Sequence, residues 1–140
     1  GNALNDDGNN NRISLSQTGE GNVGLAASYY GSDNQIAITQ TGTNNRGQLT
    51  QSGGQNQGNI TQTGQDNIAI LVHAGSNNQA AILQEGDGNS LLGLETGYTS
   101  AAVQYGFGNS LSLTQSGDFN MLRLSQSGNN NTATVRQGPQ

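Results

Sequence analysis

Residues 34–45 read NQIAITQTGTNN, and this stretch sets the pattern for the whole chain. Alternate side chains along a β-strand share one face of it. The alternate residues here are an amide, two aliphatic residues and a second amide: Asn34, Ile36, Ile38 and Gln40. Gly42 then predicts a turn, and Asn45 begins the next stretch of the same kind, eleven residues after Asn34. The unit is therefore a short strand followed by a turn, which leaves no room for a helix.

The same spacing continues to the end of the chain. We count twelve units, which begin at Asn11, Asn22, Asn34, Asn45, Asn56, Asn67, Asn78, Asn89, about Tyr98, Asn109, Asn120 and Asn131. A content of only 30% hydrophobic residues with 22 Gly would by itself favour a disordered polar chain. A fixed period over the whole chain is instead typical of repeat architectures, and this signal outranks composition.

Composition excludes several classes of function. The net charge is −5 and Lys is absent, so the chain has no basic stripe for nucleic acid or anionic lipid. There is no Cys for a disulfide framework or a thiolate metal site. The longest apolar run, around residues 69–72, is far too short to cross a bilayer. No residues are predicted to be catalytic, to bind a cofactor or to bind a metal.

The repeat predicts an all-β fold, a β-solenoid in which two units form one coil of about 22 residues. Twelve units then give about six two-strand coils. We divide the chain into a flexible N-terminal lead-in at residues 1–10, the solenoid at residues 11–138 and a C-terminal tail at residues 139–140. Aliphatic side chains two and four positions after each Asn form a thin apolar core.

Amides beside that core need hydrogen-bond partners. Coils stacked about 4.8 Å apart supply them, because each amide donates to one neighbouring coil and accepts from the other. The predicted amide ladder contains Asn11, Gln17, Asn34, Gln40, Asn45, Gln51, Asn56, Gln62, Asn67, Asn78, Gln84, Asn89, Gln104, Asn109, Gln115, Asn120, Gln126, Asn131 and Gln137. One column is expected to hold Gln17, Gln40, Gln62, Gln84, Gln104 and Gln126. The other is expected to hold Ser28, Gln51, His73, Glu95, Gln115 and Gln137.

His73 and Glu95 are neighbours in that second column. An acid/base pair would need a nucleophile or a second carboxylate nearby, and the sequence places none there. We interpret both residues as substitutions in an amide ladder. A further hypothesis is that protonated His73 pairs with Glu95, which would make assembly sensitive to pH near 6.5.

The first and last units keep the full pattern, and the single Pro, Pro139, lies beyond the last strand. A solenoid without terminal caps exposes strand edges that recruit further chains. We therefore expect stacking into a cross-β amyloid fibre. Its end interfaces are predicted at Asn11, Ile13, Leu15, Gln17, Asn131, Ala133, Val135 and Gln137.

The units NQAAILQEGDGN (78–89), NIAILVHAGSNN (67–78) and NTATVRQG (131–138) resemble the curlin repeat, S-x5-Q-x-G-x-x-N-x-A-x3-Q, of bacterial curli functional amyloid. The resemblance extends over residues 11–138 and is greatest to the major subunit. It departs from the family pattern where Asn replaces the leading Ser and where Ser28, His73 and Glu95 replace Gln.

The resemblance implies a secreted protein of bacterial cell-surface fimbriae that serves biofilm matrix, adhesion and surface colonisation. The implied partners are further copies of the chain, a nucleator subunit, periplasmic chaperones and an outer-membrane secretion pore. Two alternatives stay open. The chain is then either the minor nucleator subunit or, in a different class, a monomeric solenoid that binds ice through outward Thr39, Thr50 and Thr61.

Overall fold

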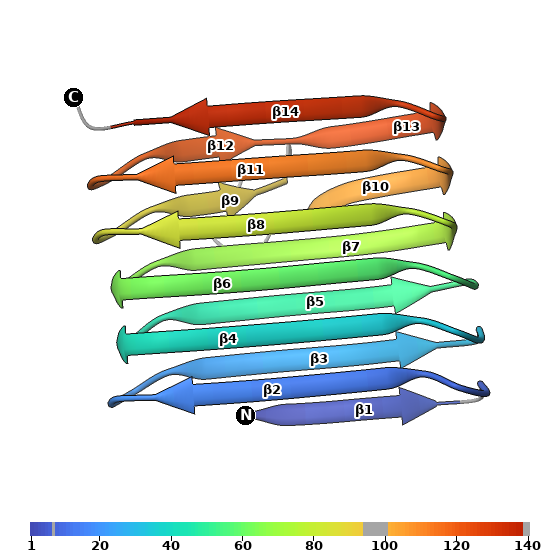
Figure 1. Cartoon of the computed structure of the whole chain (residues 1–140), viewed down its shortest axis with the longest axis horizontal. Helices are drawn as coiled ribbons and strands as arrows, with labels where there is room; N and C mark the ends of the chain where they lie inside the picture. Colours follow the sequence, from blue (N-terminus) through green and yellow to red (C-terminus); the bar gives the residue numbers. More distant parts are fainter. Residues whose placement is uncertain (7, 94–100, 139–140) are drawn as a thin grey trace.

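The computed structural model describes residues 1–6, 8–93 and 101–138, and Figure 1 shows them as one stack of strands. The strands are β1 (Asn2–Asp6), β2 (Arg12–Thr18), β3 (Val23–Tyr29), β4 (Gln35–Thr43), β5 (Arg46–Ser52), β6 (Gln57–Gln65), β7 (Ile68–Ser76), β8 (Gln79–Glu85), β9 (Ser90–Leu92), β10 (Ala102–Phe107), β11 (Ser110–Ser116), β12 (Met121–Arg123), β13 (Ser125–Asn129) and β14 (Thr132–Gln137). No helix in the described ranges is long and apolar enough to span a membrane.

The strands form two parallel sheets, which we call sheet A and sheet B. Sheet A has the order β1-β3-β5-β7-β10-β13, with β9 also beside β7 and β12 beside β9. Sheet B has the order β2-β4-β6-β8-β11-β14. Because the chain alternates between the sheets, each coil adds one strand to each of them, and the six strands of sheet B correspond to six coils. This confirms the predicted all-β solenoid of about six coils, whose two termini lie at opposite ends of the stack (Figure 1).

Aliphatic side chains stack in register between the two sheets. Ile38 pairs with Ile60, Ile60 with Ile82, and Ile82 with Leu113, and all four are at most 2% exposed. Burying one such side chain stabilises a fold by about 1.5–3 kcal/mol. The core is only one layer thick, so the amides that border it must also be satisfied.

Glycine with a positive φ fixes the turns near the ends of β2, β4, β6, β8 and β11 in sheet B. Gly64 has a φ of +118°, in the region that side chains disfavour. A Cβ at this position would lie 2.1 Å from the carbonyl oxygen of Gly86 in the next coil. The close stacking of turns therefore requires Gly here, and Gly42 and Gly86 repeat the conformation with φ values of +115° and +110°.

Residues 2–6 differ from the sequence expectation of a flexible lead-in. They form β1, which pairs with β3 so that Ala3 lies beside Ala26 and Asn5 beside Ser28. All five side chains of β1 are exposed, so main-chain pairing holds this strand in place. An unpaired edge of β3 offers these main-chain hydrogen bonds without any apolar pattern in the incoming strand. The predicted tail at residues 139–140 lies outside the described residues.

The unit expected at Tyr98 is also corrected. Both β9 and β10 pair with β7, so these two strands together occupy a single position in sheet A. Tyr98 and Glu95 lie outside the described residues. The structure still has six coils, because β1 adds a strand to sheet A in place of the separate strand expected near Tyr98.

Candidate functional site

An unbroken glutamine ladder runs the full length of sheet B. The Nε2 atom of each Gln donates to the Oε1 atom of the next Gln toward the C-terminal end, at 2.7–2.8 Å. Its members are Gln17, Gln40, Gln62, Gln84, Gln115 and Gln137. All five bonds have the same direction, so the ladder presents an acceptor at one end of the stack and a donor at the other.

The same glutamines also join sheet B to sheet A. Gln62 Nε2 donates to the Arg46 carbonyl at 3.1 Å, and Gln84 Nε2 donates to the Ile68 carbonyl at 3.0 Å. Both amides are fully buried. An unpaired buried amide costs about 1–3 kcal/mol, so these bonds remove the penalty for placing Gln beside the core.

Asparagine ladders occupy the corners between the sheets. Asn67 donates from its backbone N to Asn45 Oδ1 at 3.1 Å and from Nδ2 to the same oxygen at 2.9 Å. Its Nδ2 also donates to the Gly86 carbonyl of the next coil at 2.7 Å. Equivalent corner bonds involve Asn11, Asn22, Asn34, Asn56, Asn78, Asn89, Asn109, Asn120 and Asn131. In these ladders the acceptor oxygen faces the C-terminal end, the reverse of the Gln ladder.

The ladder of sheet A has a different membership from the one expected. The structure places Asn5, Ser28, Gln51, His73, Gln104 and Gln126 in one column. Gln104 and Gln126 were expected in the column of Gln17, and Gln115 and Gln137 in the column of His73. The exchange follows because β9 and β10 share one position beside β7, which shifts the alternation between sheets by one strand.

Sheet A therefore has gaps in its hydrogen bonding. Gln51 Nε2 and His73 Nδ1 are 3.3 Å apart, and Gln104 Nε2 donates to Gln126 Oε1 at 2.7 Å. Three buried ladder atoms in the described residues have no partner: Gln51 Oε1, His73 Nε2 and Gln104 Oε1. Gln51 Oε1 lies on the side of Ser28, whose side chain is shorter than that of Gln. His73 Nε2 and Gln104 Oε1 lie where an imidazole ring replaces an amide.

His73 is fully buried, and its pKa is lowered from 6.5 to about 4 by desolvation. The polar side chain of Gln104 beside the ring offsets only part of this effect. Because Nδ1 faces the Gln51 donor, we assign the proton to Nε2, which faces Gln104. The neighbour expected from the sequence was Glu95, which lies outside the described residues. Gln104 occupies the expected position instead.

At each end of the stack, the ladder side chains have no further coil to which they can hydrogen-bond. Among the described residues, nothing donates to Gln17 Oε1 or Asn131 Oδ1. Gln137 Nε2 donates only to the Met121 carbonyl, at 3.0 Å, whereas the Nε2 atom of each inner Gln of sheet B donates at least two hydrogen bonds, as Gln62 does to Gln84 and Arg46. The apolar residues of the end coils are only partly buried against the core: Ile13, Leu15, Leu122, Leu124, Ala133 and Val135.

The predicted ladder omitted Asn22, whose Oδ1 accepts hydrogen bonds from Asn45, and sequence reasoning missed Asn5 altogether. Asn5 lies in register with Ser28, and its Oδ1 accepts a hydrogen bond from Asn11 Nδ2 at 2.8 Å. Asn5 is thus the first rung of sheet A at the N-terminal end. The alternation of Ala3 and Asn5 repeats that of Ala26 and Ser28, a weak signal that the acidic residues around it obscure.

The chain matches the curlin associated repeat over residues 8–42 and 106–138. The chain belongs to the curlin family. Curlins are extracellular fibre subunits and not a family of enzymes. No curated protein sequence matches this curlin.

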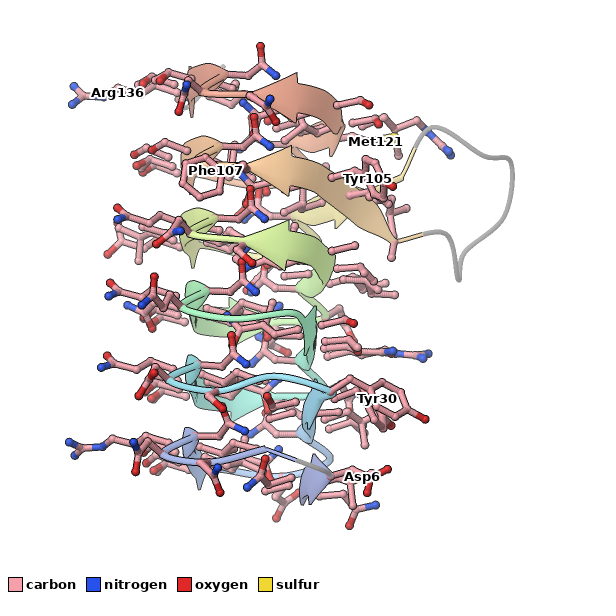
Figure 2. The ribbon with its side chains drawn as sticks, turned by 90° about the vertical axis from the view of Figure 1, so that its right-hand side faces the viewer. Asp6, Tyr30, Tyr105, Phe107, Met121 and Arg136 are labelled. Carbon is pink, nitrogen blue, oxygen red and sulfur yellow. The ribbon has the colours of Figure 1, made fainter. Side chains whose placement is uncertain are left out.

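The outward threonines of this curlin do not form the single array expected for ice binding. Thr39 and Thr61 lie side by side in sheet B, whereas Thr50 lies in sheet A, beside Val72. The two sheets face opposite ways, as Figure 2 shows for Arg136 on one side and Tyr105 on the other. The structure therefore gives ice binding no specific support.

Proposed function

We propose that this curlin is a structural subunit of an extracellular curli-type amyloid fibre and that its copies stack head to tail. The observation that carries the proposal is the complementarity of the two ends. The C-terminal end presents the Gln137 donor and the Asn131 acceptor, and the N-terminal end presents the Gln17 acceptor and the Asn11 backbone donor.

The register within sheet B defines the joint. β2 of an incoming copy would lie on β14 as β14 lies on β11. Gln137 would then donate to Gln17 of the partner subunit, and Asn131 Oδ1 would accept from Asn11 of the partner subunit. Ala133 and Val135 would meet the partner's Ile13 and the partner's Leu15, which completes the core and removes apolar surface from water.

The direction of the ladders supports a polar fibre. Two C-terminal ends brought together would oppose donor to donor in the Gln column and acceptor to acceptor in the Asn column. Head-to-tail contact satisfies both columns and leaves each new end identical to the last, so growth does not close on itself.

Family membership supports a secreted, cell-surface location and a role in biofilm matrix, adhesion and surface colonisation. The partners we propose are further copies of the chain, a nucleator subunit, periplasmic chaperones and an outer-membrane secretion pore. We favour the major subunit over the minor nucleator because both end units keep an intact ladder pattern.

The test is thioflavin T fluorescence after dilution from denaturant at neutral pH, with and without preformed fibre seeds. We expect a lag that seeds abolish and a fibre-diffraction reflection at about 4.7–4.8 Å along the fibre axis. A folded, soluble monomer with flat fluorescence would contradict the proposal. If trace amounts instead shortened the lag of a different curlin while the chain alone formed no fibres, the nucleator role would replace it.

A further inference from the structure

A groove runs along the outer face of sheet B, parallel to the direction in which the coils stack. Its floor is one column of mostly small side chains: Ser14, Ala37, Asn59, Ala81 and Ser112. Its volume is about 630 Å³. The strands that contribute to it cover five of the six coils, so the groove runs along most of the subunit.

The groove lies between two columns of larger side chains. One wall consists of the long polar residues Arg12, Gln35, Gln57 and Gln79 and ends at the shorter Ser110. The column on the other side holds Ser16, Thr39, Thr61, Leu83 and Thr114. We call the first wall the Gln ridge. Ridge and groove are two residues apart on each strand, about 6.6 Å.

We propose that this face is the lateral contact between two fibres, with the Gln ridge of each fibre seated in the groove of the other. The proposal rests on the proposed function, because head-to-tail stacking would join the grooves of successive subunits into one continuous channel. The occupant is a second copy of this chain, related by a two-fold axis parallel to the stack. This two-fold rotation seats the Gln ridge of each copy in the groove of the other, so both contacts form together.

The side chains match at equal height along the two stacks. Gln57 would lie against Asn59 of the partner subunit, where the two amides can hydrogen-bond. Gln35 and Gln79 would lie over Ala37 of the partner subunit and Ala81 of the partner subunit, whose methyl groups leave room for them. In-register columns that interdigitate in this way form the dry interfaces of paired cross-β sheets.

Charge also favours this face. The chain carries a net charge of −5, yet within the part of the chain that the structure describes no acidic residue lines the groove, and Arg12 is the one charged residue that does. Glu85 is the acid closest to it along β8, four residues after Ala81. Two such faces can therefore approach without the repulsion that the rest of the surface would impose.

Over the described residues, the hollow on the outer face of sheet A is smaller and shorter. This hollow of about 240 Å³ involves only β1, β3 and β5, where Leu4, Leu25 and Tyr29 contribute. Farther along the stack, β9 ends at Leu92 and β10 begins at Ala102, so the strand columns are interrupted. Sheet B has no such break among its described strands.

The test is the mass per unit length of wild-type fibres, measured by scanning transmission electron microscopy. A single stack places one chain of 14.4 kDa in six coils, about 29 Å at 4.8 Å per coil. We expect wild-type fibres to have twice that mass per length and the Ala37→Arg variant to have the single value. Arginine at this position fills the groove where the partner's Gln35 would lie, and it brings additional positive charge from both fibres into the contact.

Gln48→Arg is the matched control, because Gln48 holds in β5 of sheet A the place that Ala37 holds in β4 of sheet B. We expect it to keep the double mass. Gln57→Ser shortens the ridge without adding charge and should raise the fraction of single stacks at least twofold. If Ala37→Arg does not form fibres, the mass per length of Gln57→Ser fibres tests the lateral contact instead.

Wild-type fibres of single mass, or double-mass fibres from both Ala37→Arg and Gln57→Ser, would overturn the lateral contact and leave end-to-end stacking intact. The absence of any wild-type fibre would instead overturn the proposed function, and the lateral contact with it.

Discussion

His73 is the residue at which the ladder of sheet A departs most from the repeat. A neutral imidazole can accept from Gln51 and present an N–H toward Gln104, so it partly replaces the amide that the other coils use. Protonation would remove the acceptor and place a charge in a fully buried column. The folded stack therefore favours neutral His73.

We predict that acidification weakens the fibre through this residue. The pKa of His73 is lowered to about 4 when folded, against 6.5 in the unfolded chain, so between these values the unfolded chain binds more protons. The stabilisation is complete above pH 6.5 and is lost as the pH falls toward 4, by up to about 3 kcal/mol. The measurement is the concentration of soluble chain in equilibrium with fibres between pH 7 and 4.5.

His73→Gln is the control, since carboxylates titrate in both proteins and cancel in the comparison. Glutamine should bond to both Gln51 and Gln104 and remove the pH dependence that belongs to the imidazole. Identical pH profiles for the two proteins would show that His73 does not act as argued.

At the scale of the structural element, the strands follow from period-two alternation and the turns follow from Gly. β4, for example, begins one residue after Asn34, and β6 one residue after Asn56. β1 could not be predicted in the same way, because none of its side chains is buried. Its pairing depends on the main-chain groups of β3, which no sequence pattern in residues 2–6 reports.

We predict that Gly64→Ala prevents normal assembly, whereas Gly54→Ala is tolerated. Alanine at position 64 must adopt a φ near +118° with its Cβ 2.1 Å from the Gly86 carbonyl, a cost of about 2 kcal/mol or more. Gly54 has no positive φ, and its nearest neighbour would be 3.4 Å from the new Cβ. Thioflavin T kinetics and the soluble concentration at equilibrium measure both effects. Equal behaviour of the two variants would contradict the role of the stacked turns.

At the scale of the whole molecule, the end rungs should control growth. We predict that Gln17→Ala and Asn131→Ala slow elongation from wild-type seeds about fivefold to tenfold, because each leaves an unpaired amide at the joint. Gln62→Ala should slow it less, since its bonds form within the arriving subunit after docking. The initial slope of seeded thioflavin T traces gives the rates. Equal slopes for all three variants would show that the ends are not the docking surfaces.

The sequence by itself determined the repeat, the strand faces, the amide and aliphatic positions within each unit and the resemblance to curlins. All of these depend on neighbours within about eleven residues. Only the tertiary structure decided to which sheet each unit after Asn89 belongs. Successive units alternate between the sheets, so the assignment depends on whether β9 and β10 occupy one position in sheet A or one position in each sheet. The tertiary structure also brought β1 and Asn5 into the first coil. The physical reason is the same in both cases: main-chain pairing between distant segments sets the stacking order, and it leaves no trace in local side-chain pattern.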